Sequence, residues 1–230
     1  MQPPVIELKN VFLTLTGGSG EVNILKGVDL FVHQQETLAL VGPSGSGKTT
    51  TLMIMAGLER PSSGEVRIGG TLLNTMSEDD LARFRRETMG IVFQSFHLIP
   101  SMTALENTAL PLEFARVPKA MERAREALDA VGIVDRSGHY PAQLSGGEQQ
   151  RVALARAFVG HPRVILADEP TGNLDQETGV RVMQMLLELH RAYGTSLVLI
   201  THDLTLADLC SRKARMVSGR VETDAEFSHA

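Results

Sequence analysis

The sequence of 230 residues has a single cysteine, Cys210, so the chain cannot form an internal disulfide bond. This composition fits a reducing compartment, because disulfides persist mainly in oxidising ones. No run of residues approaches the roughly 18 uninterrupted apolar residues of a membrane-spanning helix, and residues 1–10 lack the apolar core of a signal peptide. The formal net charge of -5 argues against broad, nonspecific binding of nucleic acid. These absences predict a cytoplasmic protein without a nucleic-acid partner.

The clearest motif is a glycine-rich loop between a predicted strand and a predicted helix. Residues 37–41 form an apolar run typical of a buried parallel strand, and residues 50–58 predict a helix that ends near Gly57. Glycines let the backbone wrap around a polyphosphate with its N–H groups pointing inward, and the helix N-terminus adds partial positive charge. We expect the lysine to reach the β- and γ-phosphates and the threonine after it to bind Mg²⁺. The predicted nucleotide-binding residues of this loop are Gly42, Pro43, Ser44, Gly45, Ser46, Gly47, Lys48, Thr49 and Thr50.

The rest of the chain predicts an α/β organisation. The first third is rich in predicted strands, at residues 5–8, 11–15 and 64–68 and as a pair of strands within 24–32, with a flexible glycine-rich loop at 17–20. Residues 103–138 are predicted to be mostly helical, with Pro111 and Pro118 as breaks. Two further apolar runs, 164–167 and 196–200, are typical of parallel strands, and a predicted helix at 180–193 joins them.

Two carboxylates follow the apolar run 164–167. Asp168 ends the predicted strand, where its carboxylate is placed to hold Mg²⁺. Glu169 comes next and is predicted to accept a proton from an attacking water molecule. The structural alternative is a pair of exposed acids at the end of a strand.

A second possible phosphate site lies in the segment Leu144, Ser145, Gly146, Gly147 and Glu148, which opens a predicted helix. One chain that binds one nucleotide has little use for two phosphate sites. The pattern therefore predicts that two chains pair head to tail, so that each segment caps the γ-phosphate held by the loop of the other chain. An ordinary serine N-cap is the alternative.

Six motifs in this order resemble the nucleotide-binding subunit of an ABC transporter: the phosphate loop, Gln94, 144–148, 168–169, 173–175 and 201–203. The resemblance covers residues 5–219. It implies a P-loop NTPase with a RecA-like core, an N-terminal antiparallel β subdomain and an inserted α-helical subdomain. The implied single ABC ATPase domain spans 1–230, with a catalytic lobe at 1–93 and 160–220 and a Q-loop and helical subdomain at 94–159.

The resemblance also implies a role for each motif residue. The implied catalytic residues are Glu169, His202, Gln94 and Lys48, and the implied Mg²⁺ ligands are Thr49, Gln94 and Asp168. The implied D-loop at the dimer seam consists of Asn173, Leu174 and Asp175. Leu15 aligns with an aromatic residue that stacks on adenine in relatives, and no aromatic residue lies between Leu13 and Leu30, so selectivity for ATP over GTP stays open. Gln35 is a lesser departure, at a position where relatives often have glycine.

Within the family, residues 93–107, 144–151 and 168–175 are similar to the lipoprotein-releasing (LolD), MacB-type and FtsE group, and most of all to its YbbA-like branch. This implies an ATPase that needs ATP and Mg²⁺, forms a homodimer upon ATP binding and drives an integral membrane permease with a large periplasmic domain. The enzyme would lie on the inner face of the cell membrane and act on lipids, lipoproteins or hydrophobic compounds. The alternatives are an FtsE-like scaffold ATPase in cell division and a non-transport ABC ATPase. A small-molecule P-loop kinase would leave residues 145–148 unexplained.

Overall fold

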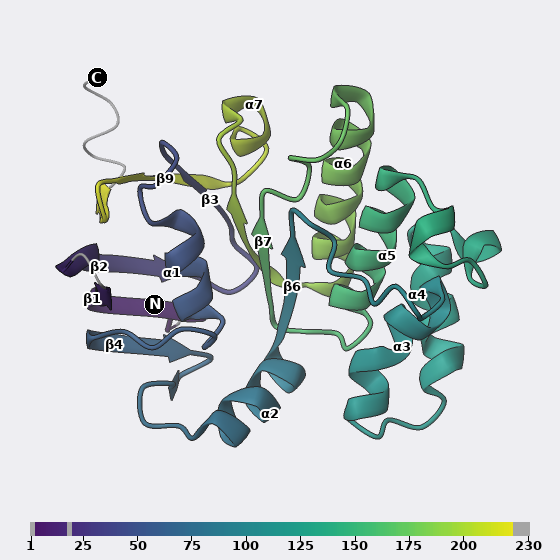
Figure 1. Cartoon of the computed structure of the whole chain (residues 1–230), viewed down its shortest axis with the longest axis horizontal. Coiled ribbons are helices and arrows are strands. Elements are labelled where there is room, and N and C mark those ends of the chain that lie inside the picture. Colours follow the sequence, from purple (N-terminus) through teal and green to yellow (C-terminus); the bar gives the residue numbers. More distant parts are fainter. Residues whose placement is uncertain (1–2, 18–19, 223–230) are drawn as a thin grey trace. The chain divides into compact units, whose positions relative to one another are not determined.

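The computed structural model describes residues 3–17 and 20–222, so the middle of the predicted loop 17–20 lies outside the described residues. The chain forms two compact units (Figure 1). The first unit takes the described part of Met1–Arg85 and Ser196–Ala230, and the second unit is Arg86–Thr195.

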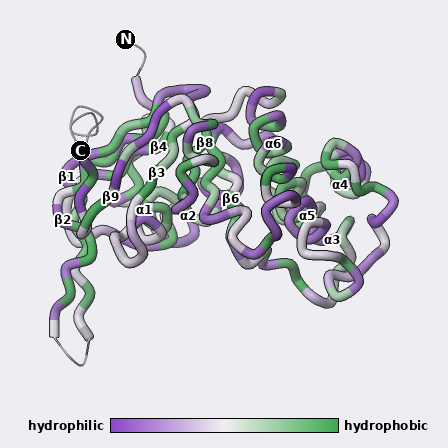
Figure 2. The backbone as a smooth tube through the Cα atoms, turned by 90° about the horizontal axis from the view of Figure 1, so that it is seen from above, coloured by the Kyte–Doolittle hydropathy of each residue, from purple (hydrophilic) through white to green (hydrophobic). Residues whose placement is uncertain are grey.

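An antiparallel sheet with the strand order β2-β1-β4-β5 makes up one part of the first unit. Strands β1 (Ile6–Gly17) and β2 (Gly20–Val32) pair along their length and form a long hairpin (Figure 2), followed in the sheet by β4 (Ser63–Ile68) and β5 (Thr71–Leu72). The predicted N-terminal antiparallel β subdomain is therefore present.

The prediction of two strands within residues 24–32 is wrong, because β2 runs through this region without a turn. Gly27 has a φ of 80° at an irregularity of the β1–β2 register. A Cβ atom at this glycine would lie 3.1 Å from the Asn10 Oδ1 atom, so the residue serves a β-bulge with a close neighbour. The predicted strand segments 5–8 and 11–15 belong to the single strand β1, which begins at Ile6, with Asn10 in the left-handed region between them.

A second sheet in the first unit is centred on β3 (Thr37–Val41), whose five residues are all buried. Strands β8 (Ser196–Ile200) and β9 (Arg212–Val217) run parallel to β3, one on each side, and β10 (Arg220–Glu222) pairs antiparallel with β9. Because β3 and β8 are parallel neighbours, their carboxyl ends lie at one edge of the sheet. The helices α1 (Lys48–Met55) and α7 (Leu204–Ala207) follow these two strands.

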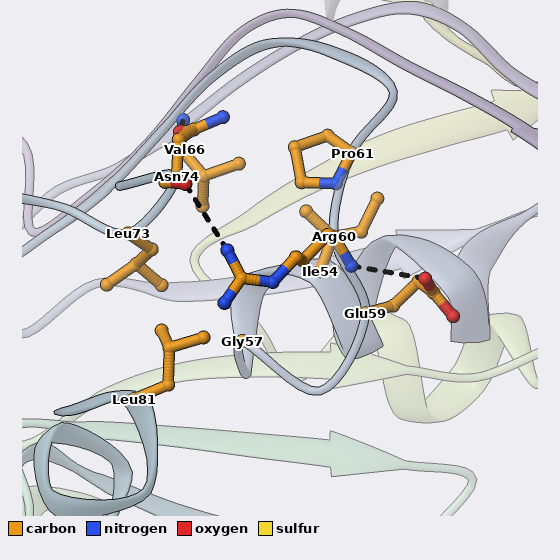
Figure 3. Close-up of a pocket in the computed structure, with 9 residues that line it drawn as sticks. All are labelled: Ile54, Gly57, Glu59, Arg60, Pro61, Val66, Leu73, Asn74 and Leu81. Atoms are coloured by element: carbon orange, nitrogen blue, oxygen red, sulfur yellow. Dashed lines mark hydrogen bonds between the residues drawn. The ribbon is translucent and has the colours of Figure 1, made fainter. Parts of the chain in front are cut away.

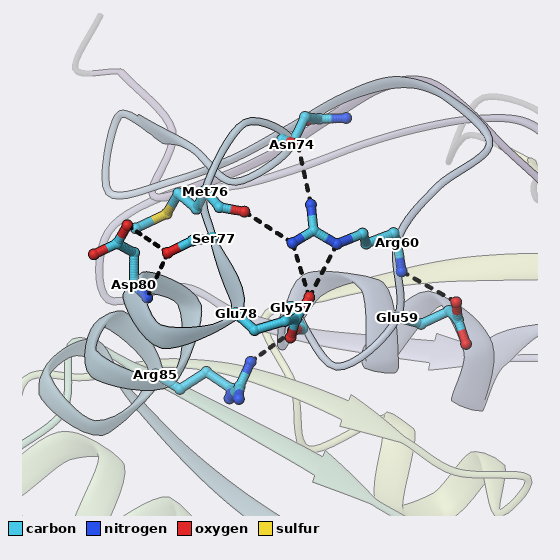
Figure 4. A network of polar contacts seen from close by, with 9 residues as sticks. All are labelled: Gly57, Glu59, Arg60, Asn74, Met76, Ser77, Glu78, Asp80 and Arg85. Atoms are coloured by element: carbon cyan, nitrogen blue, oxygen red, sulfur yellow. Dashed lines mark hydrogen bonds and ion pairs between the residues drawn. The ribbon is translucent and has the colours of Figure 1, made fainter.

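Arg60 fixes the turn between α1 and β4. Its guanidinium donates to the carboxylate of Glu78 at 2.8 and 3.0 Å and to the carbonyl of Met76 at 2.8 Å, at the start of α2 (Glu78–Thr88) (Figure 4). Beside it lies a cavity of about 80 Å³, bordered by Leu73 and Leu81 (Figure 3). Arg60 and Glu78 are exposed, so the ion pair adds little stability by itself. Its effect is to order the turn after α1.

The second unit combines two parallel strands with four helices. Strands β6 (Met89–Phe93) and β7 (Val164–Asp168) pair so that Phe93 lies opposite Asp168. The helices α3 (Ala104–Phe114), α4 (Ala120–Ala130) and α5 (Gly146–Phe158) lie next to one another (Figure 1), and α6 (Gln176–Tyr193) packs against α5. Short 3₁₀ turns at Val134–Arg136 and Pro141–Gln143 lead into α5. The mostly helical structure predicted for 103–138 is thus observed.

The prediction that Pro111 breaks this helical region is wrong, because Pro111 lies inside α3. A proline within a helix removes one hydrogen bond and costs about 3 kcal/mol. Here only three residues of α3 follow it, and Leu112 among them is buried. Packing of the last turn outweighs the lost bond, since tertiary contacts supply most of the stability of helices in proteins. Pro118, in contrast, does separate α3 from α4.

Within residues 3–17 and 20–222, no helix combines the length and the apolar character needed to cross a membrane.

Candidate nucleotide site

The glycine-rich loop joins β3 to α1 as predicted, and its backbone requires glycine. Gly42, Gly45 and Gly47 have φ values of 153°, 75° and 106°. A Cβ atom at Gly42 would lie 2.1 Å from the Met216 carbonyl oxygen, whereas a Cβ atom at Gly45 would meet nothing within 4 Å. The loop is therefore tightly packed where it leaves β3 and open at its middle, where a ligand can approach the backbone.

A lysine side chain and a helix N-terminus bring positive charge to this loop. The Lys48 Nζ atom is buried with its side chain and donates to the carbonyls of Gly42 at 2.8 Å and Pro43 at 3.0 Å. Helix α1 begins at Gly47 without a side-chain cap and has no acidic residue in its first turn. The positive dipole end of the helix therefore favours an anion. The buried Ser46 Oγ atom has no hydrogen-bond partner within the described residues, which also fits a ligand at this loop.

His202 follows β8, at the sheet edge where the phosphate loop follows β3. The residues on both sides fix its backbone: Thr201 is buried, and its Oγ1 atom accepts a hydrogen bond from the Asp203 amide at 3.0 Å. The Asp203 carboxylate caps α7 and accepts from the Thr205 hydroxyl at 2.6 Å, which lowers the pKa of Asp203 below its ordinary value. Hydrogen bonds thus order the backbone on both sides of His202, whose imidazole is exposed.

In the second unit, the structure brings together two predicted motifs that are distant in the sequence. The Gln94 Nε2 atom donates to the Asn173 Oδ1 atom at 3.3 Å, and the Asn173 Nδ2 atom donates to the Gln94 carbonyl at 3.0 Å. A Cβ atom at Gly172 would lie 2.8 Å from the Gln94 Nε2 atom, so this glycine leaves room for the glutamine. Since Phe93 pairs with Asp168, Gln94 also follows the residue opposite the predicted Mg²⁺ ligand.

The backbone turns sharply after Asp168. Glu169 is half-buried and has a φ of 45°, and its carbonyl accepts from the Gly172 amide at 3.0 Å. Asp175 then caps α6 by accepting from the Thr178 amide at 3.0 Å, and this bond lowers the pKa of the Asp175 carboxyl. The helix predicted from residue 180 therefore begins four residues earlier, at Gln176.

The segment 144–148 forms the beginning of α5. Ser145 and Glu148 make a capping box: the Glu148 Oε2 atom accepts from the Ser145 amide and hydroxyl, both at 2.8 Å, and these bonds lower the pKa of Glu148. A Cβ atom at Gly147 would lie 2.6 Å from the Thr178 Cγ2 atom, so α5 begins close against α6. A polar hollow of about 620 Å³ opens beside this segment and is also lined by Arg136 and Arg151.

The residues predicted to hold Mg²⁺ offer a hydroxyl, a carboxylate and an amide, which are the oxygen donors that this ion prefers. The part of the chain that the structure describes contains no group of three His, Cys, Asp or Glu side chains that could hold a metal. In a phosphate-loop site, phosphates and water supply the remaining ligands of the ion. Leu15, the residue predicted to pack on the base, is 45% exposed and pairs across the hairpin with Val22.

Sequence reasoning missed the turn that supports the phosphate loop. The Gly219 amide donates to the Ser46 carbonyl at 2.9 Å, and the Gly219 carbonyl accepts from the Lys26 amide at 2.8 Å. Together with Met216, this turn between β9 and β10 packs against the loop. The dipeptide Ser218-Gly219 is a recognisable turn signal, but nothing in the sequence links it to residues 42–47.

The site and the fold together define a class of protein. A glycine-rich phosphate loop follows a buried parallel strand, and a helical unit in the same chain begins α5 with a Ser-Gly-Gly segment. This is the organisation of an ATP-binding cassette. The family model described as ABC transporter matches residues 25–172, and the chain belongs to this family.

Several known proteins are similar over nearly the whole chain. The ABC transporter ATP-binding protein YbbA of Escherichia coli is 49% identical over 96% of this chain and 98% of its own length. The lipoprotein-releasing system ATP-binding protein LolD of Geobacter metallireducens is 50% identical over 92% of this chain and 96% of its own length. The macrolide export ATP-binding/permease protein MacB of Wolinella succinogenes is 45% identical over 96% of this chain but only 34% of its own length.

Among solved structures, the ATP-binding cassette MJ0796, a dimer in a post-hydrolysis state bound to ADP and Pi, has a TM-score of 0.88 and 42% identity over 95% of this chain and 97% of its own. The predicted family, its YbbA, LolD and MacB relatives and the ABC ATPase fold are thus confirmed. The same findings support the role of an ATP-binding, ATP-hydrolysing subunit that works with Mg²⁺.

Proposed function

We propose that this chain is the ATP-hydrolysing subunit of a mechanotransmission transporter, in which ATP is bound between two copies of the chain. The observation that carries the proposal is the phosphate loop, with the buried Lys48 side chain bonded to its Gly42 carbonyl and with the uncapped, acid-free N-terminus of α1 after it. The dimer bound to ADP and Pi that MJ0796 forms supports pairing of two cassettes.

Each predicted site residue receives a role in this proposal. Residues 42–50 hold the triphosphate, Leu15 packs on the base, and Thr49, Gln94 and Asp168 hold Mg²⁺, which neutralises charge on the β- and γ-phosphates when bound. Glu169 accepts the proton of the water molecule that attacks the γ-phosphorus, so that ADP and phosphate are the products. His202 and Gln94 contact the γ-phosphate. The segment 144–148 of the second copy covers it, with 173–175 at the seam.

We also propose that the catalytic lobe comprises residues 1–93 and 160–220 and that 94–159 form the Q-loop and helical lobe. The helical lobe would transmit dimer closure to a membrane permease. MacB supports such a partner, because its name includes a permease and this chain matches only 34% of its length. The name of LolD suggests lipoproteins among the possible cargoes. We infer a permease with a large periplasmic domain, lipid, lipoprotein or hydrophobic cargo, and a place on the inner face of the cell membrane.

The test is a pull-down from native membranes with tagged Glu169→Gln in the presence of ATP, followed by mass spectrometry. Recovery of a permease with few membrane spans and a large periplasmic domain is the expected result. Recovery of a permease with six or more spans per subunit would indicate ordinary solute transport, and recovery of a division complex would indicate a scaffold. The matched control is Lys48→Ala, which should recover less permease if ATP-driven pairing stabilises the complex.

A further inference from the structure

The backbone just after Gln94 adopts an unfavourable conformation. Phe96 and His97 have φ values of 35° and 49°, in the left-handed region where a side chain approaches the following carbonyl oxygen too closely. The His97 amide donates back to the Ser95 carbonyl and closes a three-residue turn around Phe96. The rings of Phe93 and His97 meet edge to face at 5.0 Å. Two consecutive bulky residues keep positive φ values only where contacts with surrounding residues stabilise them.

Arg156, in the last part of α5, holds this turn. Its Nη2 atom donates to the Phe96 carbonyl at 2.6 Å, and its Nη1 atom donates to the His97 carbonyl at 2.7 Å. One planar guanidinium thus binds both carbonyls of the strained residues in a fixed fork. A lysine at this position would keep the positive charge but would present it as a single point without the fork.

The turn touches two segments of the proposed site. On one side it continues from Gln94, whose side chain lies over Gly172 and is bonded to Asn173. On the other side, the Phe96 Cζ atom lies 3.8 Å from the position that a Cβ atom of Gly146 would take. Movement of the turn would therefore displace Gln94 from the residues after β7 and Phe96 from the beginning of α5.

We propose that Arg156 is a positioning residue that holds Gln94 in register with the segment 144–148 through the Phe96–His97 turn. Helix α5 begins after Ser145 and carries Arg156 near its other end. It would thereby transmit the engagement of its N-terminus to Gln94, without a contact between the arginine and the nucleotide. This inference rests on the proposed function, because it assumes that Gln94 acts at the γ-phosphate.

The experiment compares Arg156→Gln and Arg156→Lys with Arg125→Gln in the full chain. Arg125 is exposed in α4 and is a matched control for loss of an arginine from a helix of the same unit. We expect Arg156→Gln to lower kcat for ATP about 10- to 100-fold, the effect of a small displacement of a catalytic group, with KM for ATP changed less than about 2-fold. The kcat of Arg156→Lys should lie between those of Arg156→Gln and the wild type, and the kcat of Arg125→Gln should equal that of the wild type.

Hydrogen exchange of the peptide covering residues 95–99 gives a second readout that does not depend on activity. We expect faster exchange there in Arg156→Gln, with exchange in β7 unchanged. A wild-type kcat in Arg156→Gln would overturn the inference, whether or not hydrogen exchange changes. A loss of ATP affinity as large as the loss in kcat would also overturn it. If Arg156→Gln fails to fold, Arg156→Lys decides by the same two criteria. Absence of ATPase activity in the wild type would instead contradict the proposed function, and unchanged exchange would still overturn the role of Arg156.

Discussion

Two helix N-termini in this chain face the same physical problem and solve it differently. Helix α1 begins at Gly47, without a side-chain cap and without an acidic residue in its first turn. Helix α5 begins at Ser145, which caps the helix together with Glu148, and Glu148 also pairs with Arg136 at 3.1 Å. No side chain of the protein caps the N-terminus of α1, whereas side chains of the protein already bond to backbone N–H groups at the N-terminus of α5.

This difference indicates which helix end binds nucleotide within one copy of the chain and which end requires a second copy. In the proposed function, the α1 end binds a polyphosphate within one copy of the chain, because the helix dipole and Lys48 both favour an anion. The α5 end carries a carboxylate in its first turn, which opposes a free anion there. In the proposed function, this end contributes when another copy brings a bound nucleotide to it, as head-to-tail pairing requires.

The largest expected effect follows from removing the charge at α1. Lys48→Ala should weaken ATP binding at least about 100-fold and abolish hydrolysis, because the loop loses the cation that reaches the β- and γ-phosphates. Isothermal titration with ATP and Mg²⁺ measures the binding. Lys9→Ala, which removes an exposed lysine paired with Glu7, should bind as the wild type does. Retained affinity in Lys48→Ala would contradict the assignment of this loop.

A smaller and more selective effect is expected at α5. In Gly147→Ala the new Cβ atom would lie 2.6 Å from the Thr178 Cγ2 atom, so either the Thr178 side chain must change rotamer or α5 and α6 must shift. We expect ATP binding by one copy to stay within about 2-fold, while ATP-dependent pairing is lost and kcat falls about 100-fold.

Gly160→Ala is the matched control, because a Cβ atom at Gly160 meets nothing within 4 Å. Analytical ultracentrifugation with and without ATP measures pairing. If Gly147→Ala also loses the binding of ATP by a single copy, the two helix ends are not separate in function.

The smallest expected effect concerns the cap of α5. Hydrogen bonds from Ser145 lower the pKa of Glu148 below its ordinary value of 4.5, so its carboxylate stabilises the folded state above that pH. The stabilisation is lost as the pH falls through the lower pKa of the folded state. At pH 7, Glu148→Gln should reduce the free energy of unfolding by about 0.5–1 kcal/mol.

Urea denaturation of both proteins at pH 7 and in acid measures this difference, which should shrink as the acid protonates Glu148. Glu126→Gln, an exposed change in α4, corrects for general effects of charge. A difference that stays constant with pH would show that the carboxylate does not support the cap.

Local signals carried most of the sequence prediction. The run 37–41 and its loop, the strand 196–200 and the helix that begins with Ser145 all depend on patterns of neighbouring residues, and all are present. The predictions of two strands within 24–32 and of a break at Pro111 are wrong because the structure around these residues decides the outcome. A β-bulge at Gly27 keeps β2 continuous, and burial of Leu112 keeps α3 intact after the proline.

Contacts between distant residues could not be predicted from one sequence. The pairing of Gln94 with Asn173 and the support of the phosphate loop by Gly219 depend on how the strands are arranged, and the chain carries no local mark of either contact. Arg156 is a similar case, since its position in α5 gives no hint that it binds the Phe96 and His97 carbonyls.

The most direct test of the central claim is the mass of Glu169→Gln in solution, measured by light scattering with and without ATP and Mg²⁺. If two copies complete each other's site, blocking hydrolysis should trap a dimer of about twice the 25.0 kDa chain mass with ATP, and adding Gly147→Ala should return it to a monomer. A Glu169→Gln protein that binds ATP tightly and stays monomeric would contradict the claim that the α5 end of a second copy completes the site.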